Sequence, residues 1–310
     1  MPRSFDAVML IGFGGPTRPA EIRPFLEKVL RGRAADPGRL EEVAAHYERI
    51  GGRSPYNELT LRQAAALERE LARIGIARPV AVGLRNSPPL IVDTLAALSA
   101  RGARRVLGFI MSPFQCEASW DRYQLNVAEA RAQLGASAPE VEYVAPWSDD
   151  PQFVEAAAAR IDEAARSLTT EARRAAQLIF TAHSIPVAMA SASPYVEQFT
   201  NAARRIAEAL GIENWTLAFQ SRSGAPRDPW LEPDIRDALR ASRARDAIVM
   251  PLGFLCDHVE VLYDLDIEAA AVARSADIRM LRAATVGDHP AFIRMMAARI
   301  QRHLEGAIGG

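Results

Sequence analysis

The chain has 310 residues, which exceeds the size of one typical hydrophobic core and predicts two packed domains. Hydrophobic residues make up 49% and charged residues 24%, which excludes a disordered or fibrous chain. Lys and Arg total 37 against 38 Asp and Glu, so a net charge of −1 gives no reason to expect nucleic acid as a partner.

Cysteine and apolar segments limit the setting in which the protein works. Two cysteines, Cys116 and Cys256, are too few for a disulfide scaffold or a four-thiolate cluster. We expect both to be small buried side chains in a cytoplasmic protein. The apolar N-terminal stretch, residues 7–13, is too short for a secretory signal or a membrane span, so we expect peripheral membrane contact at most.

Short apolar runs alternate with longer amphipathic stretches, a pattern typical of βα units on a parallel sheet. In the first half it predicts strands at residues 7–11, 80–84, 106–111 and 141–144, and helices at 59–74, 91–101 and 119–134. In the second half it predicts strands at 177–181, 216–220, 247–251 and 280–283, and helices at 151–168, 194–210, 233–241, 259–274 and 290–304. A proline-containing segment at 145–151 separates the halves, so we expect two α/β domains, residues 1–148 and 149–310.

Ligands of open parallel sheets bind beyond the carboxyl ends of the strands. The segments that follow the predicted strands are residues 12–16, 85–88, 113–117, 183–186, 221–226 and 253–260. The first is a glycine turn without the third glycine of a dinucleotide motif or the Gly-Lys-Ser/Thr of a phosphate loop. We therefore interpret it as a turn that lets a flat ligand approach the backbone, in preference to a nucleotide site.

A histidine, His183, follows the predicted strand at 177–181. A neutral imidazole at such a position can ligate a metal or accept a proton near physiological pH. Taken alone, a packed histidine that bonds to the nearby backbone is an equally good interpretation.

Three carboxylates, Glu260, Asp264 and Glu268, follow the predicted strand at 247–251 at helical spacing i, i+4 and i+8. Like charges at that spacing destabilise a helix, so a compensating cation is expected beside them. Three oxygen donors in a row suit hydrated divalent ions such as Fe(II). The alternative interpretation, an exposed acidic helix face without a functional role, also stays open. For His258 we favour a structural role, because successive helical positions point in different directions.

A further group of side chains could hold anionic substituents of a substrate. Guanidinium, imidazole and hydroxyl donors cluster at Arg31 and Arg33 after a helical stretch, then at His46 and Tyr47, and at 53–56. Arginines on a protein surface without a binding role would give the same sequence pattern.

Four stretches of the sequence together resemble the ferrochelatase family over nearly the whole chain: residues 48–55, 182–186, 220–233 and 253–264. The resemblance implies two Rossmann-like domains, with a porphyrin cleft between them, in a chelatase-like fold. It also implies that His183 and Glu260 are the catalytic residues facing the macrocycle. Asp264 and Glu268 extend the line, so His183, Glu260, Asp264 and Glu268 are the expected metal ligands.

Within the family the sequence is most similar to the branch that metallates coproporphyrin III. That resemblance implies a porphyrin-binding set of Phe13, Arg31, His46, Tyr47, Ser54 and Tyr123. The branch often carries an iron-ligating tyrosine where this chain has Phe13, and arginine where it has Leu30 and His46. Protoporphyrin IX therefore stays open as the substrate.

The expected activity is insertion of Fe(II) into a porphyrin in haem biosynthesis, by a monomer whose partners are porphyrin and ferrous iron. Iron is a substrate here, so no cofactor is expected, and two cysteines exclude the iron–sulfur cluster of some family members. The alternatives are a cobalt or sirohydrochlorin-type chelatase and a porphyrin or haem carrier without turnover. A single histidine with a carboxylate line favours iron, and a carrier has no use for three stacked anions.

Overall fold

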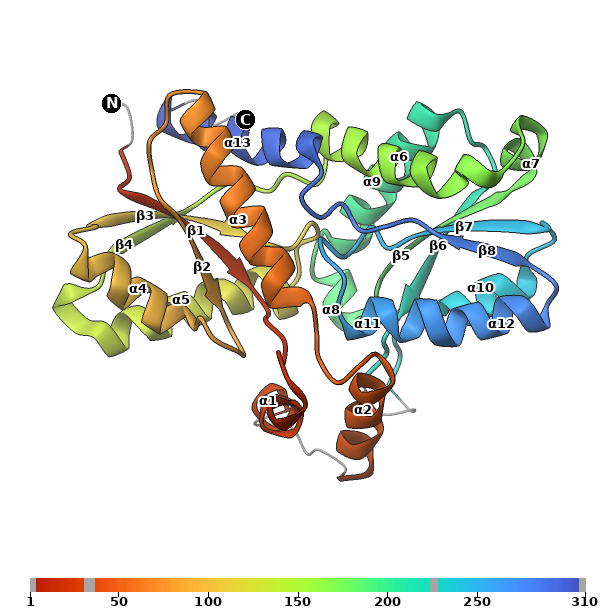
Figure 1. The fold of residues 1–310 in the computed structure, drawn as a ribbon, viewed down its shortest axis with the longest axis horizontal. Helices are drawn as coiled ribbons and strands as arrows, with labels where there is room; N and C mark the ends of the chain where they lie inside the picture. Colours follow the sequence, from red (N-terminus) through yellow and green to blue (C-terminus); the bar gives the residue numbers. More distant parts are fainter. Residues whose placement is uncertain (1–3, 31–36, 224–227, 307–310) are drawn as a thin grey trace. The chain divides into compact units, whose positions relative to one another are not determined.

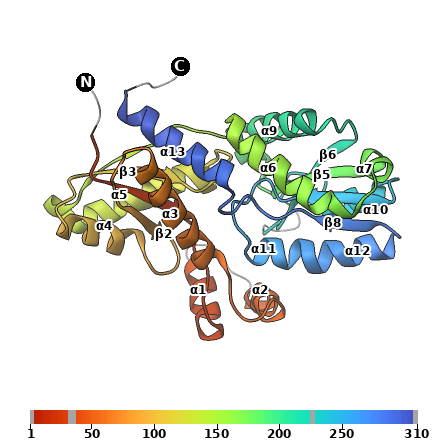
Figure 2. The ribbon, with the colours of Figure 1, turned by 45° about the horizontal axis from the view of Figure 1, so that its top comes forward.

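The structure, a computed structural model, describes residues 4–30, 37–223 and 228–306. The chain forms two compact units, each a parallel sheet with helices on both faces (Figures 1 and 2). Unit 1 comprises Met1–Ser112, Ala118–Pro146 and Phe292–Gly310, and unit 2 comprises Pro113–Glu117 and Trp147–Ala291. Within the described ranges, no helix combines the length and apolar character that crossing a membrane requires.

The sheet of unit 1 has the order β2-β1-β3-β4, and every pair is parallel. Its strands are β1 (Ala7–Gly12), β2 (Val80–Leu84), β3 (Arg105–Ile110) and β4 (Glu140–Tyr143). The central strand β1 is buried along its whole length, because helices cover both faces of the sheet. Its apolar run is therefore continuous and does not alternate with polar residues.

The helices of unit 1 form two layers and one projecting pair (Figure 1). On one face, α4 (Ile91–Ala100) and α5 (Arg122–Leu134) share a core with β1 and β3. The opposite face carries α3 (Tyr56–Arg73) and α13 (Pro290–Leu304). Beyond the carboxyl end of β1 lie α1 (Ile22–Val29) and α2 (Pro37–Arg49). Three short helices follow: η1 (Pro19–Glu21), the π-helix η2 (Glu117–Asp121), which belongs to this unit from Ala118 onward, and η3 (Gly135–Ser137).

The sheet of unit 2 repeats the pattern with the order β6-β5-β7-β8, again all parallel. Its strands are β5 (Gln177–His183), β6 (Trp215–Gln220), β7 (Asp246–Met250) and β8 (Arg279–Arg282). One face carries α6 (Pro151–Ala164), η4 (Ala165–Ser167), α7 (Thr170–Ala175) and α9 (Tyr195–Leu210), and α8 (Val187–Ser191) follows β5. The other face carries α10 (Ile235–Ala241), α11 (Val259–Leu262), the π-helix η5 (Asp264–Ala269) and α12 (Ala270–Ser275).

The predicted α/β fold is confirmed, and each of the eight predicted strands is present with its ends shifted by at most two residues. The predicted helix at 259–274 is wrong in one respect, because η5 interrupts it. The backbone N–H of Glu268 bonds to the carbonyl of Tyr263 at 3.0 Å, which is the i→i−5 pattern of a π-turn. The regular α-helical spacing assumed for the three carboxylates is therefore broken after Tyr263.

The chain passes from unit 1 to unit 2 at Pro146 and Trp147, next to the boundary expected from the sequence. The last helix, α13, differs from that expectation, because from Phe292 onward it belongs to unit 1. Its Arg299 donates to the carbonyl of Pro146, and its His303 lies 3.3 Å from Glu142. The porphyrin cleft expected between two domains stays a prediction.

Candidate active site

His183 is the last residue of β5. Its Nδ1 lies 2.5 Å from the carbonyl oxygen of Ser184, and only a protonated nitrogen can bond there because a carbonyl accepts and cannot donate. Nε2 is therefore the nitrogen that can accept a proton or bind a metal. The hydroxyl of Tyr195 donates to the carbonyl of His183 at 2.9 Å and fixes the backbone of the residue.

Glu260 lies in the first turn of α11, and its Oε1 is 3.4 Å from Nε2 of His183. The two side chains are 34% and 32% exposed, so both can reach a bound substrate. His258 is the N-cap of α11, and its Nδ1 accepts the backbone N–H of Glu260 at 3.2 Å. The side-chain amide of Gln220 donates to the carbonyl of Glu260. His258 therefore has the structural role expected from the sequence.

A glycine brings the loop after β7 against β5. A Cβ at Gly253 would lie 2.7 Å from the Cβ of Ala182, closer than side chains can approach. Its N–H bonds to the carbonyl of Thr181 at 3.0 Å. Because only glycine permits this contact, the loop that leads to Glu260 is held beside the strand that ends at His183.

The histidine and the carboxylate stabilise each other's charged forms. Burial by itself would lower the pKa of His183, but the Glu260 carboxylate raises it above its ordinary value. Burial would raise the pKa of Glu260, but His183 lowers it. Burial lowers the pKa of His258, so the capping imidazole is neutral and can accept the Glu260 N–H. The site thus contains one histidine whose cationic form is favoured by a neighbouring carboxylate and one whose neutral form is favoured by burial.

Asp264, at the start of η5, is a carboxyl that titrates near neutral pH. Burial, together with the carboxylates of Glu260 and Glu268, raises its pKa to about 7. The hydroxyl of Ser221 donates to Asp264 and opposes this shift. Ser221 has a φ of +63°, a left-handed conformation that a serine adopts only at some cost and that directs this hydroxyl from the loop after β6.

Glu268 faces a cation of the protein itself. Its Oε2 lies 3.7 Å from the guanidinium of Arg236, which also bonds to Asp234 at 2.8 Å. Arg236 thus places a guanidinium beside Glu268, and the divalent cation expected beside the three carboxylates stays a prediction. Among the described residues, no three His, Cys, Asp or Glu side chains come close enough together to hold a metal ion.

The described side chains that are expected to bind porphyrin belong to unit 1. The ring of Phe25 lies 6.2 Å from the rings of both Phe13 and Tyr47, in edge-to-face contacts that join α1, α2 and the end of β1. Phe13 is partly exposed, whereas Tyr47 is 4% exposed. Burial lowers the pKa of His46, so this residue is a neutral group and not a cation at pH 7.

The other expected porphyrin ligands are less accessible. Ser54 is 4% exposed, and its N–H bonds to the carbonyl of Pro16 at 2.7 Å. Tyr123 is 6% exposed and belongs to the core shared by α4, α5 and the sheet. Arg31 and Arg33 lie outside the described residues. The glycine turn packs against protein, since a Cβ at Gly14 would lie 2.4 Å from the hydroxyl of Ser87.

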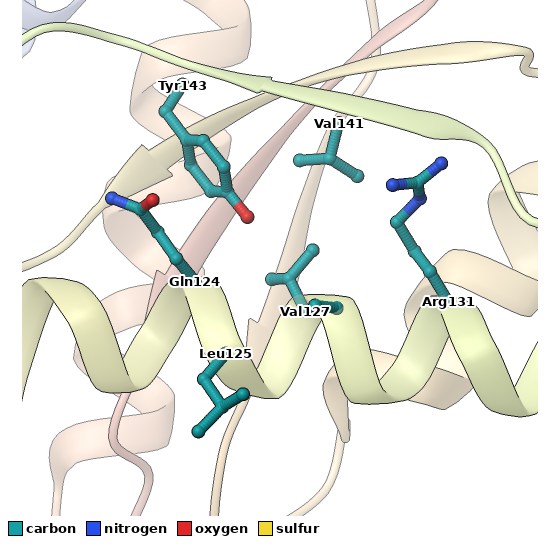
Figure 3. A pocket seen from close by; sticks show the side chains of 7 residues that line it. Gln124, Leu125, Val127, Arg131, Val141 and Tyr143 are labelled. Carbon is teal, nitrogen blue, oxygen red and sulfur yellow. The ribbon is translucent and has the colours of Figure 1, made fainter.

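Figure 3 shows a pocket of unit 1 between α5 and β4. None of the predicted site residues lines it; the lining residues are Gln124, Leu125, Val127, Ala128, Arg131, Val141 and Tyr143. Burial raises the pKa of Tyr143 to about 12, so its hydroxyl is neutral at physiological pH.

Two parallel four-stranded sheets, with a histidine–carboxylate pair at the carboxyl edge of one of them, define a chelatase-like α/β fold. Solved structures of that class have the same fold. One is the sirohydrochlorin chelatase SirB from Bacillus subtilis subspecies spizizenii in complex with cobalt (TM-score 0.58, 13% identity, 98% of this chain and 97% of that chain). Another is CbiX, described as the terminal enzyme for biosynthesis of siroheme in denitrifying bacteria (TM-score 0.57, 19% identity, 95% and 98%).

Sequence comparison then identifies the family. The ferrochelatase family model matches residues 5–304. The chain is 44% identical to the coproporphyrin III ferrochelatase of Mycolicibacterium smegmatis over 98% of its own length and 91% of that protein. It is 40% identical to the ferrochelatase of Rhodopirellula baltica over 97% of its own length and 86% of that protein. This chain belongs to the ferrochelatase family, and it is an enzyme that inserts a metal into a porphyrin.

Proposed function

We propose that this chain inserts Fe(II) into coproporphyrin III, with His183 and Glu260 at the point of insertion. The observation that carries the proposal is the separation of 3.4 Å between Nε2 of His183 and Oε1 of Glu260, on side chains that both keep exposed surface. Insertion removes two protons from the pyrrole nitrogens and strips water from the ion. A base next to an anionic oxygen ligand suits both tasks.

The proton path follows from the two ring nitrogens. Neutral His183 accepts a pyrrole proton at Nε2, since Nδ1 is bonded to the carbonyl of Ser184. The Glu260 carboxylate stabilises the resulting imidazolium and offers its oxygen to the ferrous ion. Asp264, with a pKa of about 7, takes protons from the pair and releases them at neutral pH.

We propose that the four expected metal ligands act in succession and not as one chelate. Support comes from their arrangement, because the described residues contain no compact set of three ligands. Glu268 receives the ion at the outer end, where Arg236 offsets its charge, and Asp264 and Glu260 pass it inward to neutral His183, whose Nε2 accepts a pyrrole proton only after the ion has left it. Weak successive sites suit a substrate ion that must leave again.

Coproporphyrin III is proposed because two relatives are coproporphyrin III ferrochelatases. They come from Mycolicibacterium smegmatis and Nocardia farcinica and are 44% and 42% identical to this chain. This substrate carries four propionates and protoporphyrin IX carries two, so it needs more donors. Phe13 and His46 keep partly exposed side chains and are proposed to contact the ring first. Arg31, Tyr47, Ser54 and Tyr123 are proposed to serve the propionates, the last three after a local rearrangement that exposes them.

The test is anaerobic metallation by the purified protein, with Fe(II) and each porphyrin in separate reactions, followed by absorbance. We expect coproporphyrin III to give the larger kcat/KM, and Glu260→Gln to lose most activity with either porphyrin. A larger kcat/KM for protoporphyrin IX would contradict the substrate choice, while activity with neither would contradict the function. Cobalt with sirohydrochlorin serves as the third reaction, because only a sirohydrochlorin chelatase would prefer it.

We also propose that the enzyme is a cytoplasmic monomer that binds no nucleic acid and touches membranes at most peripherally. The balanced charge of the chain supports the absence of nucleic acid. Cys116 and Cys256 are both buried, and a chain with only two cysteines suits a reducing compartment. Sedimentation equilibrium tests the monomer, and fractionation of cells that express the protein tests its location.

A further inference from the structure

One arginine connects the two segments that carry the acidic residues of the site. Arg282, the last residue of β8, donates from Nη1 and Nη2 to Asp257 at 3.3 and 3.2 Å. It also donates from Nε and Nη2 to Asp266 at 2.7 and 2.9 Å. The guanidinium is thus bidentate to two carboxylates at once, which only the planar fork of arginine permits.

Each of the two aspartates lies close in sequence to a residue of the site. Asp257 directly precedes His258, the N-cap that accepts the N–H of Glu260. Asp266 lies inside η5, two residues after Asp264. The arrangement is also secured from a third side, since the hydroxyl of buried Thr285 donates to Asp257 at 3.1 Å.

The surroundings give these ion pairs more strength than surface pairs have. The side chain of Arg282 is 18% exposed, against 23% for Asp257 and 34% for Asp266. Removing the guanidinium leaves two partly buried carboxylates facing each other without a cation, and like charges then push the two segments apart. The turn before Glu260 and the π-helix that carries Asp264 would shift together.

We propose that Arg282 is a positioning residue for metal insertion, which holds Glu260 and Asp264 in register with His183 by clamping Asp257 and Asp266. Arg282 touches neither His183 nor Glu260, so it acts through the turn and the π-helix. The inference rests on the metal-insertion function of this chain. Its consequence is that substitutions at Arg282 slow the reaction and leave porphyrin binding unchanged.

The test compares Arg282→Ala, Arg282→Lys and the wild type for kcat, KM and porphyrin affinity by fluorescence quenching. Arg282→Ala should lower kcat about ten- to a hundredfold, because small displacements of catalytic groups cost that much, with the porphyrin Kd within about twofold. Arg282→Lys should be intermediate, since lysine keeps the charge but cannot clamp both carboxylates, and it serves where the alanine variant fails to fold. The matched control is Arg240→Ala, which breaks the exposed pair with Asp237 in the same unit and should change nothing.

A double variant separates positioning from a general loss of structure. Because Arg282 is proposed to act partly through Glu260, Arg282→Ala should slow the enzyme by a smaller factor in the Glu260→Gln background than in the wild type. Equal fold-losses in both backgrounds, or normal kcat in Arg282→Ala, would overturn the proposal. A crystal structure of Arg282→Ala that keeps the 3.4 Å separation of His183 and Glu260 would overturn it without any activity measurement. Inactive wild-type protein would instead refute the function.

Discussion

Asp264 gives the sharpest prediction, because its raised pKa must make the protein less stable as pH rises. The folded state holds this proton up to a pKa of about 7, whereas the unfolded chain loses it near 3.8. The folded state therefore binds more protons between these values, and the free energy of unfolding falls as pH increases through that window. A difference of about three pKa units corresponds to an upper limit of about 4 kcal/mol. Because Asp264 is only partly buried, solvent screening reduces this limit, and we expect the free energy of unfolding to change by about 2 kcal/mol.

The substitution that tests this is Asp264→Asn, which keeps the shape and the acceptor oxygen for Ser221 but removes the charge. The variant should be about as stable as the wild type at pH 4 and about 2 kcal/mol more stable at pH 8. Urea unfolding followed by circular dichroism at pH 4, 6 and 8 measures the difference. The control is Asp237→Asn, an exposed carboxylate paired with Arg240, for which no pH-dependent gain is expected. A gain that does not depend on pH, or a loss of stability at pH 8, would refute the reasoning.

Three further predictions concern the reaction. Glu260→Gln replaces a charge-assisted contact with His183 by a neutral one. Because the two side chains are about one-third exposed, we take the lower end of the usual range for such a contact, about 1.5 kcal/mol, so kcat should fall at least about tenfold with the porphyrin Kd unchanged. Tyr195→Phe removes the bond to the His183 carbonyl and should lower kcat by a smaller factor, about threefold to tenfold at roughly 1 kcal/mol, measured in the same assay. Arg31→Ala should weaken binding of coproporphyrin III more than that of protoporphyrin IX in fluorescence quenching at fixed ionic strength, and an equal loss for both would favour protoporphyrin IX as the substrate.

The strands were predictable because helices cover both faces of each sheet. Strands covered on both faces, such as β1 and β7, must be continuous apolar runs, and turn residues bound them on both sides. Helix α2 was not predicted, because its first residues, Pro37 and Gly38, read locally as a turn although proline is well suited to the first turn of a helix. Helices α7 and α8, of six and five residues, are too short to show a periodic pattern.

The interruption of the helix at 259–274 could not be predicted from local sequence. Val261, Leu265 and Ala269 are buried at a constant spacing of four, which an α-helix and a π-turn both accommodate. The i→i−5 bond from Glu268 to Tyr263 distinguishes them, and Arg282, which is distant in the chain, contacts Asp266 in the same segment. The spacing predicts carboxylates at regular α-helical positions, and the π-helix interrupts that regular spacing.

Sequence reasoning proposes the residues of the candidate site more readily than the residues that form hydrogen bonds and ion pairs with them. His183 and Glu260 were predicted because the first follows a strand and the second begins a carboxylate series, and sequence motifs connect both to one family. Ser221 and Arg236 become partners of Asp264 and Glu268 only through the parallel order of the sheet, which joins segments about 30 to 40 residues apart. No spacing rule predicts such pairs. Tyr195 and Arg282 were missed for the same reason.

The central claim is that His183 acts on the metal or the pyrrole protons, and one measurement tests it most directly. Single-turnover metallation of coproporphyrin III by His183→Ala, with excess Fe(II) and saturating enzyme, isolates the insertion step from porphyrin binding. We predict a rate at least about a hundredfold below the wild type, with the same porphyrin Kd and the same far-ultraviolet circular dichroism. A rate within a few fold of the wild type would contradict the assignment of His183 to the chemistry.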